Sequence, residues 1–185
     1  GEKDTYFFKA GEELTSSVLS DLLTHSEAAG YMTLDLKPQL GLLHMIEQKE
    51  NGCLNQKNIF DNVIAAYLLN PLKNEYPYED IAKDYSSLMI PSRVDLARDI
   101  LGLMVPSKLD LLGKLSYDLA MDEKPEEFLK TVCFMAYTAF ASKKAMMEDL
   151  KAAGMEHLYE TIEMPLVFTL ADMEHTGIAI DAANL

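Results

Sequence analysis

Short runs of hydrophobic residues alternate with helix-like stretches in the first quarter of the chain. Residues 5–9 and residues 31–34 are compact runs of aromatic and apolar side chains, which predicts two strands. Between them, apolar residues recur at helical spacing over residues 14–24, and Gly30 follows as a stop signal. Pro38 suits the first turn of a further helix that continues toward residue 49.

A third strand and a helix are expected directly after each other at residues 59–69. Residues 59–61 (Ile-Phe-Asp) predict the strand, and Asp61 is a natural N-cap for a helix over residues 62–69. The helix should end at Asn70-Pro71, because the residue before a proline avoids the helical region. Residues 71–124 then predict short helical pieces around Ile81, Leu96 and Leu111 that are interrupted by prolines.

The last third of the chain predicts two longer helices. The first covers residues 125–150, and its apolar face comprises Phe128, Val132, Met135, Ala139, Met146 and Leu150. The second covers residues 156–175, and Pro165 either kinks it or begins a new segment. Its apolar stripe comprises Ile162, Leu166, Leu170 and Met173. Gly177 ends this helix, and residues 178–180 are expected to be extended.

A few early strands followed by helices fit an α/β fold class in which the helices gather toward the C-terminus. The length of 185 residues allows one domain, with or without a connecting helix. No apolar run approaches the roughly 20 residues that span a bilayer, and the first residues carry no signal-peptide pattern. The lone cysteines Cys53 and Cys133 fit a reducing compartment, so a cytoplasmic location without membrane contact is expected.

The charge balance argues against DNA binding by this chain alone. Sixteen Lys and Arg residues stand against thirty Asp and Glu residues, which leaves a net charge of −14. Binding to duplex DNA requires a basic surface that neutralises phosphates. We therefore expect weak or no DNA binding unless a larger parent protein supplies the basic groove. The four histidines have no zinc-ligand spacing, and the eleven methionines are expected to fill the core.

Two stretches of the sequence carry a family resemblance. Residues 59–71 (Ile-Phe-Asp-Asn-Val-Ile-Ala-Ala-Tyr-Leu-Leu-Asn-Pro) resemble a helix of the exonuclease-like domain of family A DNA polymerases. Residues 158–181, which include Leu-Tyr-Glu-Thr-Ile-Glu-Met-Pro-Leu and Gly-Ile-Ala-Ile-Asp, resemble the passage from that domain into the polymerase domain of bacterial DNA polymerase I. Their order and their separation of about ninety residues both match the family.

The resemblance implies a ribonuclease-H-like 3′–5′ exonuclease-type domain, helix-rich and without the first strands of the family. These two strands would lie upstream of Gly1 or have been lost. Residues 1–155 would form the degenerate exonuclease-like domain, and residues 156–185 the helix and strand that lead into the polymerase domain. Strands left with exposed edges could pair with a second copy, so self-association is a further expectation.

Active members of the family hold two divalent metals about 4 Å apart between several carboxylates, because these cations clamp the attacking and leaving oxygens. None of the three metal-binding motifs of the family is visible in this sequence. The run from Asp35 to Gln39 places Gln39 where the family has a metal-binding Asp, and a neutral amide does not replace that charge. The late-helix motif corresponds to the run through Thr138 that ends in Ala141, and residues 128–147 contain no acidic residue.

The resemblance therefore implies a fragment of a DNA polymerase whose own part is catalytically inactive and structural. The parent would be a magnesium-dependent nucleotidyltransferase for DNA replication and repair, with the rest of its chain as the partner of this fragment and DNA bound through that parent. Asp61 would be a structural cap. Two alternatives stay open: an active nuclease with displaced ligands such as Asp35 and Asp61, and a standalone helical interaction domain.

Overall fold

The computed structural model describes residues 7, 17–18, 21, 30–44, 58–86 and 105–177. The strand expected over residues 5–9, most of the helix over residues 14–24, the helical piece around Leu96 and the extended residues 178–180 lie outside these ranges.

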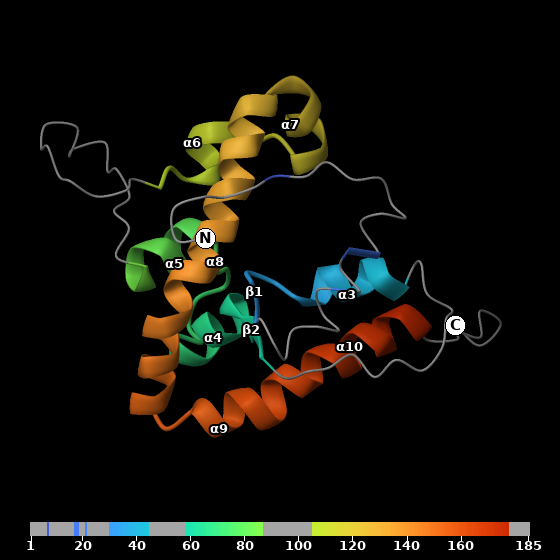
Figure 1. Cartoon of the computed structure of the whole chain (residues 1–185). Helices are drawn as coiled ribbons and strands as arrows, with labels where there is room; N and C mark the ends of the chain where they lie inside the picture. The colour runs from blue at the N-terminus through green and yellow to red at the C-terminus, as the bar shows by residue number, and fades with distance from the viewer. Residues whose placement is uncertain are drawn as a thin grey trace, which may run out of the picture.

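The described elements form a helix-rich mixed α/β structure, as the sequence predicts (Figure 1). In chain order they are β1 (Tyr31–Thr33), α3 (Lys37–His44), β2 (Ile59–Asp61), α4 (Asn62–Leu69), α5 (Tyr78–Tyr85), α6 (Lys108–Leu112), α7 (Tyr117–Glu123), α8 (Pro125–Ala152), α9 (Glu156–Leu158), the π-helical turn η1 (Tyr159–Glu163) and α10 (Met164–Thr176). No helix within these ranges has both the length and the apolar character required to cross a bilayer.

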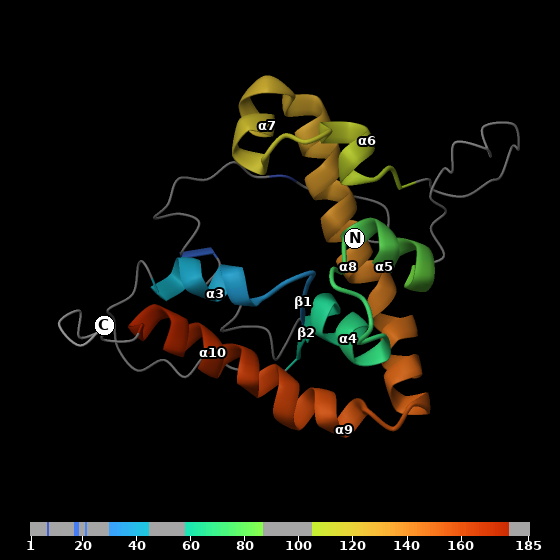
Figure 2. The same cartoon turned by 180° about the vertical axis from the view of Figure 1, so that it is seen from behind.

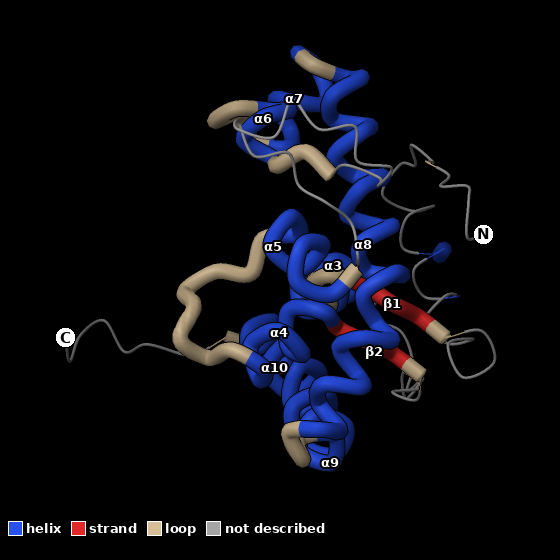
Figure 3. The backbone as a smooth tube through the Cα atoms, turned by 90° about the vertical axis from the view of Figure 1, so that its left-hand side faces the viewer, coloured by secondary structure: helices blue, strands red, loops and turns tan. Residues whose placement is uncertain are grey.

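The two strands are parallel neighbours, and α3 lies in the connection between them (Figure 3). Tyr31 is aligned with Ile59 and Thr33 with Asp61. Parallel strands cannot be joined by a tight turn, so the chain must cross over one face of the sheet between them. The strands expected at residues 31–34 and 59–61 are thus both confirmed.

Helix α8 is the longest described element, and β1, α4, α5, α6 and α7 all contact it along its length (Figures 1 and 2). The predicted helix is confirmed, but the predicted face is only partly right. Ala139, Met146 and Leu150 are buried, whereas Phe128, Val132 and Met135 are only half-buried. The other fully buried positions of this helix are polar: Thr131, Thr138 and Ser142. Two of these hydroxyls donate to backbone carbonyls one turn earlier, Thr131 to Glu127 and Ser142 to Thr138.

After α8 the chain turns at Gly154, whose φ of 70° is a left-handed conformation that favours glycine. The elements α9, η1 and α10 then form one continuous helical run that packs against α3 and α4 (Figure 2). Pro165 is the second residue of α10, directly after the π-helical turn. Proline has no N–H for an intrahelical bond, and the run changes from π-helical to α-helical geometry at this point without ending.

The apolar stripe predicted for this last helical run is wrong as a core face. Ile162, Leu166, Leu170 and Met173 are 39–62% exposed. The core is instead reached by the opposite set, which comprises Tyr159, Met164, Val167, Phe168 and Ala171. This run therefore has two apolar faces: one is buried against α3 and α4, and the described residues leave the other accessible.

Candidate functional site

Gln39, at the expected metal-binding position, lies on α3 and is bound to the strand before it. Its carbonyl oxygen accepts a hydrogen bond from the hydroxyl of Tyr31, and its amide nitrogen donates to the hydroxyl of Thr33. The same nitrogen donates to the backbone carbonyl of Asp35 at 2.7 Å. A carboxylate at this position would have no hydrogens for the last two bonds. The amide therefore fastens the start of α3 to β1.

Thr138 and Ala141 lie on α8, where Thr138 is fully buried and Ala141 is half-buried. The hydroxyl of Ser142 lies within hydrogen-bonding distance of the Thr138 carbonyl and of Oδ1 of Asn62, at 2.5 and 2.8 Å. The hydroxyl of Thr138 is buried and has no hydrogen-bond partner among the described residues. The backbone carbonyl of Thr138 thus takes part in a buried polar contact between α8 and α4.

Asn62, the first residue of α4, connects these positions through the centre of the structure. Its amide nitrogen donates to the carbonyl of Thr33 on β1 at 2.8 Å and to the carbonyl of Ala139 on α8 at 3.2 Å. Its Oδ1 accepts from Ser142. Gln39 also binds Thr33, so hydrogen bonds connect Gln39 to the Thr138 carbonyl through Thr33, Asn62 and Ser142. A buried amide that uses both its donors and its acceptor is well satisfied.

Asp61 is confirmed as the N-cap of α4. Its Oδ1 accepts from the N–H groups of Val63 and Ile64, at 2.9 and 3.1 Å, and its Oδ2 accepts from the N–H of Leu36 at 2.7 Å. The side chain is only 1% exposed. Burial raises its pKa from 3.8 to about 7, although the N–H bonds act against this rise and the nearby charge of Asp35 adds to it. Both carboxylate oxygens are thus engaged in positioning α3 and α4.

Tyr159 anchors the C-terminal helical run to β2. Its hydroxyl accepts from the N–H of Asp61 at 2.8 Å and lies 3.2 Å from the carbonyl of the same residue. Its ring lies 5.3 Å from that of Phe60. Burial raises the pKa of the Tyr159 hydroxyl, so this group stays protonated and keeps its hydrogen for the contact.

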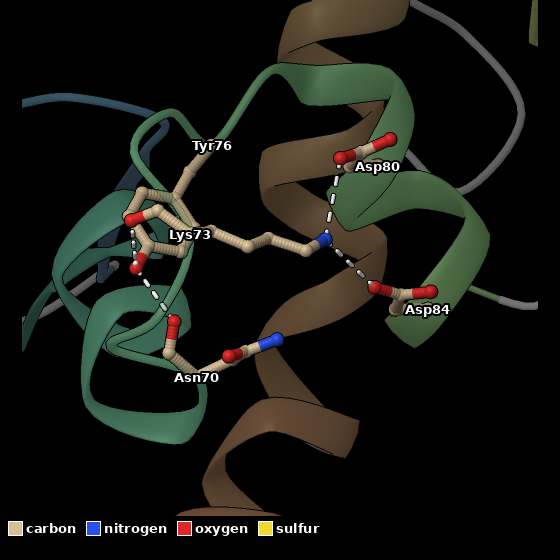
Figure 4. A network of polar contacts seen from close by, with 5 residues as sticks. All are labelled: Asn70, Lys73, Tyr76, Asp80 and Asp84. Atoms are coloured by element: carbon tan, nitrogen blue, oxygen red, sulfur yellow. Dashed lines mark hydrogen bonds and ion pairs between the residues drawn. The ribbon is translucent and has the colours of Figure 1, made fainter.

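A second polar cluster fixes the connection between α4 and α5 (Figure 4). Nζ of Lys73 lies 3.2 Å from Asp80 and 3.5 Å from Asp84, while the hydroxyl of Tyr76 donates to the carbonyl of Asn70 at 2.6 Å. The cavity beside these residues has a volume of only about 20 Å³, roughly the space of one water molecule. This cluster holds the loop in place and offers no space for a larger ligand.

A larger hollow of about 690 Å³ opens beside β2, and we call it the edge hollow. Its walls are formed by β2, by α8 and by the run from α9 to α10; the lining residues are Asn58, Ile59, Phe60, Lys143, Met147, Lys151, Glu156, Tyr159, Glu160 and Met164. Lys151 pairs with Glu156 at 3.1 Å. Within the described part of the chain, no group of three or more His, Cys, Asp or Glu side chains is arranged to hold a metal ion.

Sequence reasoning did not predict the roles of Asn62, Ser142 and Tyr159. Asn62 does leave a signal, because it is the one polar residue in a helix that otherwise reads Val-Ile-Ala-Ala-Tyr-Leu-Leu. Ser142 and Tyr159 lie 80 and 98 positions from their partners in the sequence, and no local pattern indicates contacts of that range.

Comparison with known proteins adds no relative. No protein-family model, no curated protein and no solved structure matches this chain. The resemblance to the polymerase family therefore rests on the sequence motifs.

Proposed function

We propose that this chain is part of a bacterial DNA polymerase I and serves it as a structural domain. Residues 1–155 would be a ribonuclease-H-like 3′–5′ exonuclease domain that no longer cuts, and residues 156–185 would lead into the polymerase domain. The parent enzyme would be cytoplasmic, use magnesium and contact DNA through its other parts. Parallel strands joined across a helix, followed by the helix that Asp61 caps, support this fold.

The loss of nuclease chemistry is supported by the residues at the degenerate positions. Gln39 uses its amide to bind β1, and Thr138 is enclosed beside Asn62 and Ser142. Clustered carboxylates without metal repel one another, so their replacement by neutral hydrogen-bonding groups is compatible with a stable domain.

The observation that carries the scaffold role is the second apolar face of the C-terminal helical run. Ile162, Leu166, Leu170 and Met173 form this face, which we call the outer stripe. Scattered exposed leucines are ordinary, but four apolar residues in line on one helix are typical of a contact surface. This helix directly precedes the segment that resembles the start of the polymerase domain. The outer stripe is therefore well placed to pack against that domain.

The outer stripe can be tested in the parent polymerase with Leu166→Glu and Leu170→Glu together. Because each buried leucine contributes about 1.5–3 kcal/mol, we expect a lower melting temperature and weaker DNA synthesis of the parent enzyme. The same pair in this chain alone should change the free energy of unfolding by no more than about 0.5 kcal/mol per site, since both side chains are exposed. Leu119→Glu, on α7 and outside the stripe, is the matched control. Unchanged melting and synthesis in the double variant would contradict the scaffold role.

The competing function is a nuclease that uses Asp35 and Asp61 as displaced metal ligands. One observation favours it, namely that Asp35 is close enough to Asp61 to raise its pKa. Our proposal predicts no saturable heat when manganese is titrated into this chain, and no release of nucleotides from end-labelled single-stranded DNA. Nucleotide release that depends on metal, is abolished by a chelator and is lost in Asp35→Asn would establish the nuclease instead.

A further inference from the structure

The hydrogen bonds of a parallel ladder determine which backbone groups of β2 face outward. The N–H of Tyr31 donates to the carbonyl of Asn58, in the register that aligns Tyr31 with Ile59. Backbone groups alternate in direction along a parallel ladder, so those of Phe60 point toward β1. Those of Ile59 and Asp61 point away from β1, to the outer edge of the sheet.

The outward backbone groups of β2 differ between Asp61 and Ile59 in whether another described segment binds them. At Asp61, the hydroxyl of Tyr159 bonds the N–H and lies close to the carbonyl, in the place of a neighbouring strand. At Ile59, no other described segment is hydrogen-bonded to the outward N–H and carbonyl. Such a pair on a sheet edge is a template for a further strand.

The edge hollow lies directly beside Ile59 and offers both space and charge. Its volume of about 690 Å³ is within the usual range of ligand sites, roughly 300–1,000 Å³. On the α8 wall, Lys143 has no ion-pair partner among the described residues, and its Nζ lies 6.0 Å from the centre of the Phe60 ring. Glu160 of η1 also lines the edge hollow.

We propose that the edge hollow binds an extended peptide that adds a strand to β2 at Ile59 and pairs an acidic side chain with Lys143. The outward N–H and carbonyl of Ile59 supply the main-chain recognition. Side chains of the added strand point alternately to opposite faces, so acidic residues at every second position all lie on one face. Apolar residues at the other positions suit the wall that carries Glu160, where a second acid would be repelled.

The probe is a short fluorescein-labelled peptide in which valine and glutamate alternate, and the readout is fluorescence anisotropy. We expect saturable binding that Lys143→Glu weakens at least about tenfold. Lys143→Met should weaken binding to a smaller extent without introducing a repelling charge. Lys144→Glu is the matched control, since Lys144 does not line the edge hollow, and it should change the affinity less than about threefold. The thermal unfolding of each variant checks that it is folded.

A second probe tests the main-chain contact itself. The same peptide with N-methyl groups on alternate backbone nitrogens keeps its charge but loses the hydrogens that pair with a strand edge. We expect its binding to be abolished. Equal binding of both peptides, or equal losses for the variants at 143 and 144, would show general charge attraction and overturn the proposal. A concentration-dependent dimer in sedimentation that the probe does not dissociate would also overturn it, since a second copy would then occupy the edge.

Discussion

Asn62→Asp is expected to lower the free energy of unfolding by about 3–5 kcal/mol at neutral pH, because it places an unpaired charge in the core. Asn62 has no exposed surface. Its amide nitrogen donates to the carbonyls of Thr33 and Ala139, and a carboxylate would turn both contacts into repulsions between oxygens. A typical domain has a total stability of about 5–15 kcal/mol, so the effect is a large fraction of it. Urea unfolding, followed by circular dichroism, measures this change in the free energy of unfolding.

The matched control is Asn70→Asp, the same chemical change at the exposed other end of α4. It should cost no more than about 1 kcal/mol, the usual cost of a negative charge at a helix C-terminus. Asn62→Asp should also recover part of its stability at low pH, where the new carboxyl is protonated and can donate one of the two lost hydrogen bonds. Equal effects of the two substitutions would mean that the central network around Asn62 contributes nothing specific.

Replacing Asp61 is expected to change how stability depends on pH. Burial raises the pKa of Asp61 from 3.8 to about 7 in the folded chain. Between about pH 4 and pH 7 the folded state therefore holds a proton that the unfolded state has released, and the free energy of unfolding falls as the pH rises. One group with this shift contributes up to about 4 kcal/mol across the window, on the order of 1.4 kcal/mol per pKa unit. Above about pH 7 both states are ionised, and the contribution of Asp61 is constant.

Two variants separate this titration from the capping role. Asp61→Asn and Asp61→Ser both remove the ionisable group, while serine keeps an oxygen that can cap α4. We expect the stability of the original chain, relative to either variant, to decrease from pH 4 to pH 7. Asp61→Asn should be the less stable of the two at high pH, because its amide hydrogens would face the N–H of Leu36. Parallel stability curves for all three chains would show that Asp61 does not titrate in this range.

The local elements of the fold follow directly from the sequence. The strand at residues 59–61, the cap at Asp61 and the helix end before Pro71 depend on contacts within a few residues, and the structure confirms all three. The two long helices are also confirmed, because apolar periodicity over many residues is a strong signal. For the candidate site, the sequence identified the neutral residues at Gln39, Thr138 and Ala141 before their surroundings were known.

The contacts that these residues make could be determined only from the tertiary structure. Periodicity shows that a helix has apolar positions, but not which of two apolar faces is covered, and the predicted stripe is the face that the described residues leave exposed. The buried polar face of α8 has the same cause, since the hydroxyl of Ser142 on that face finds its partner only because Asn62 approaches from another element.

The sequence by itself determined the two described strands, the cap at Asp61 and the two long helices, because these depend on residue chemistry and near neighbours. Only the tertiary structure decided which side chains meet across 80 to 98 positions: Ser142 with Asn62, and Tyr159 with the outer edge of β2. That edge beside Ile59 became visible only once the register of the two strands was known, because a shift by one residue would turn the opposite backbone groups outward.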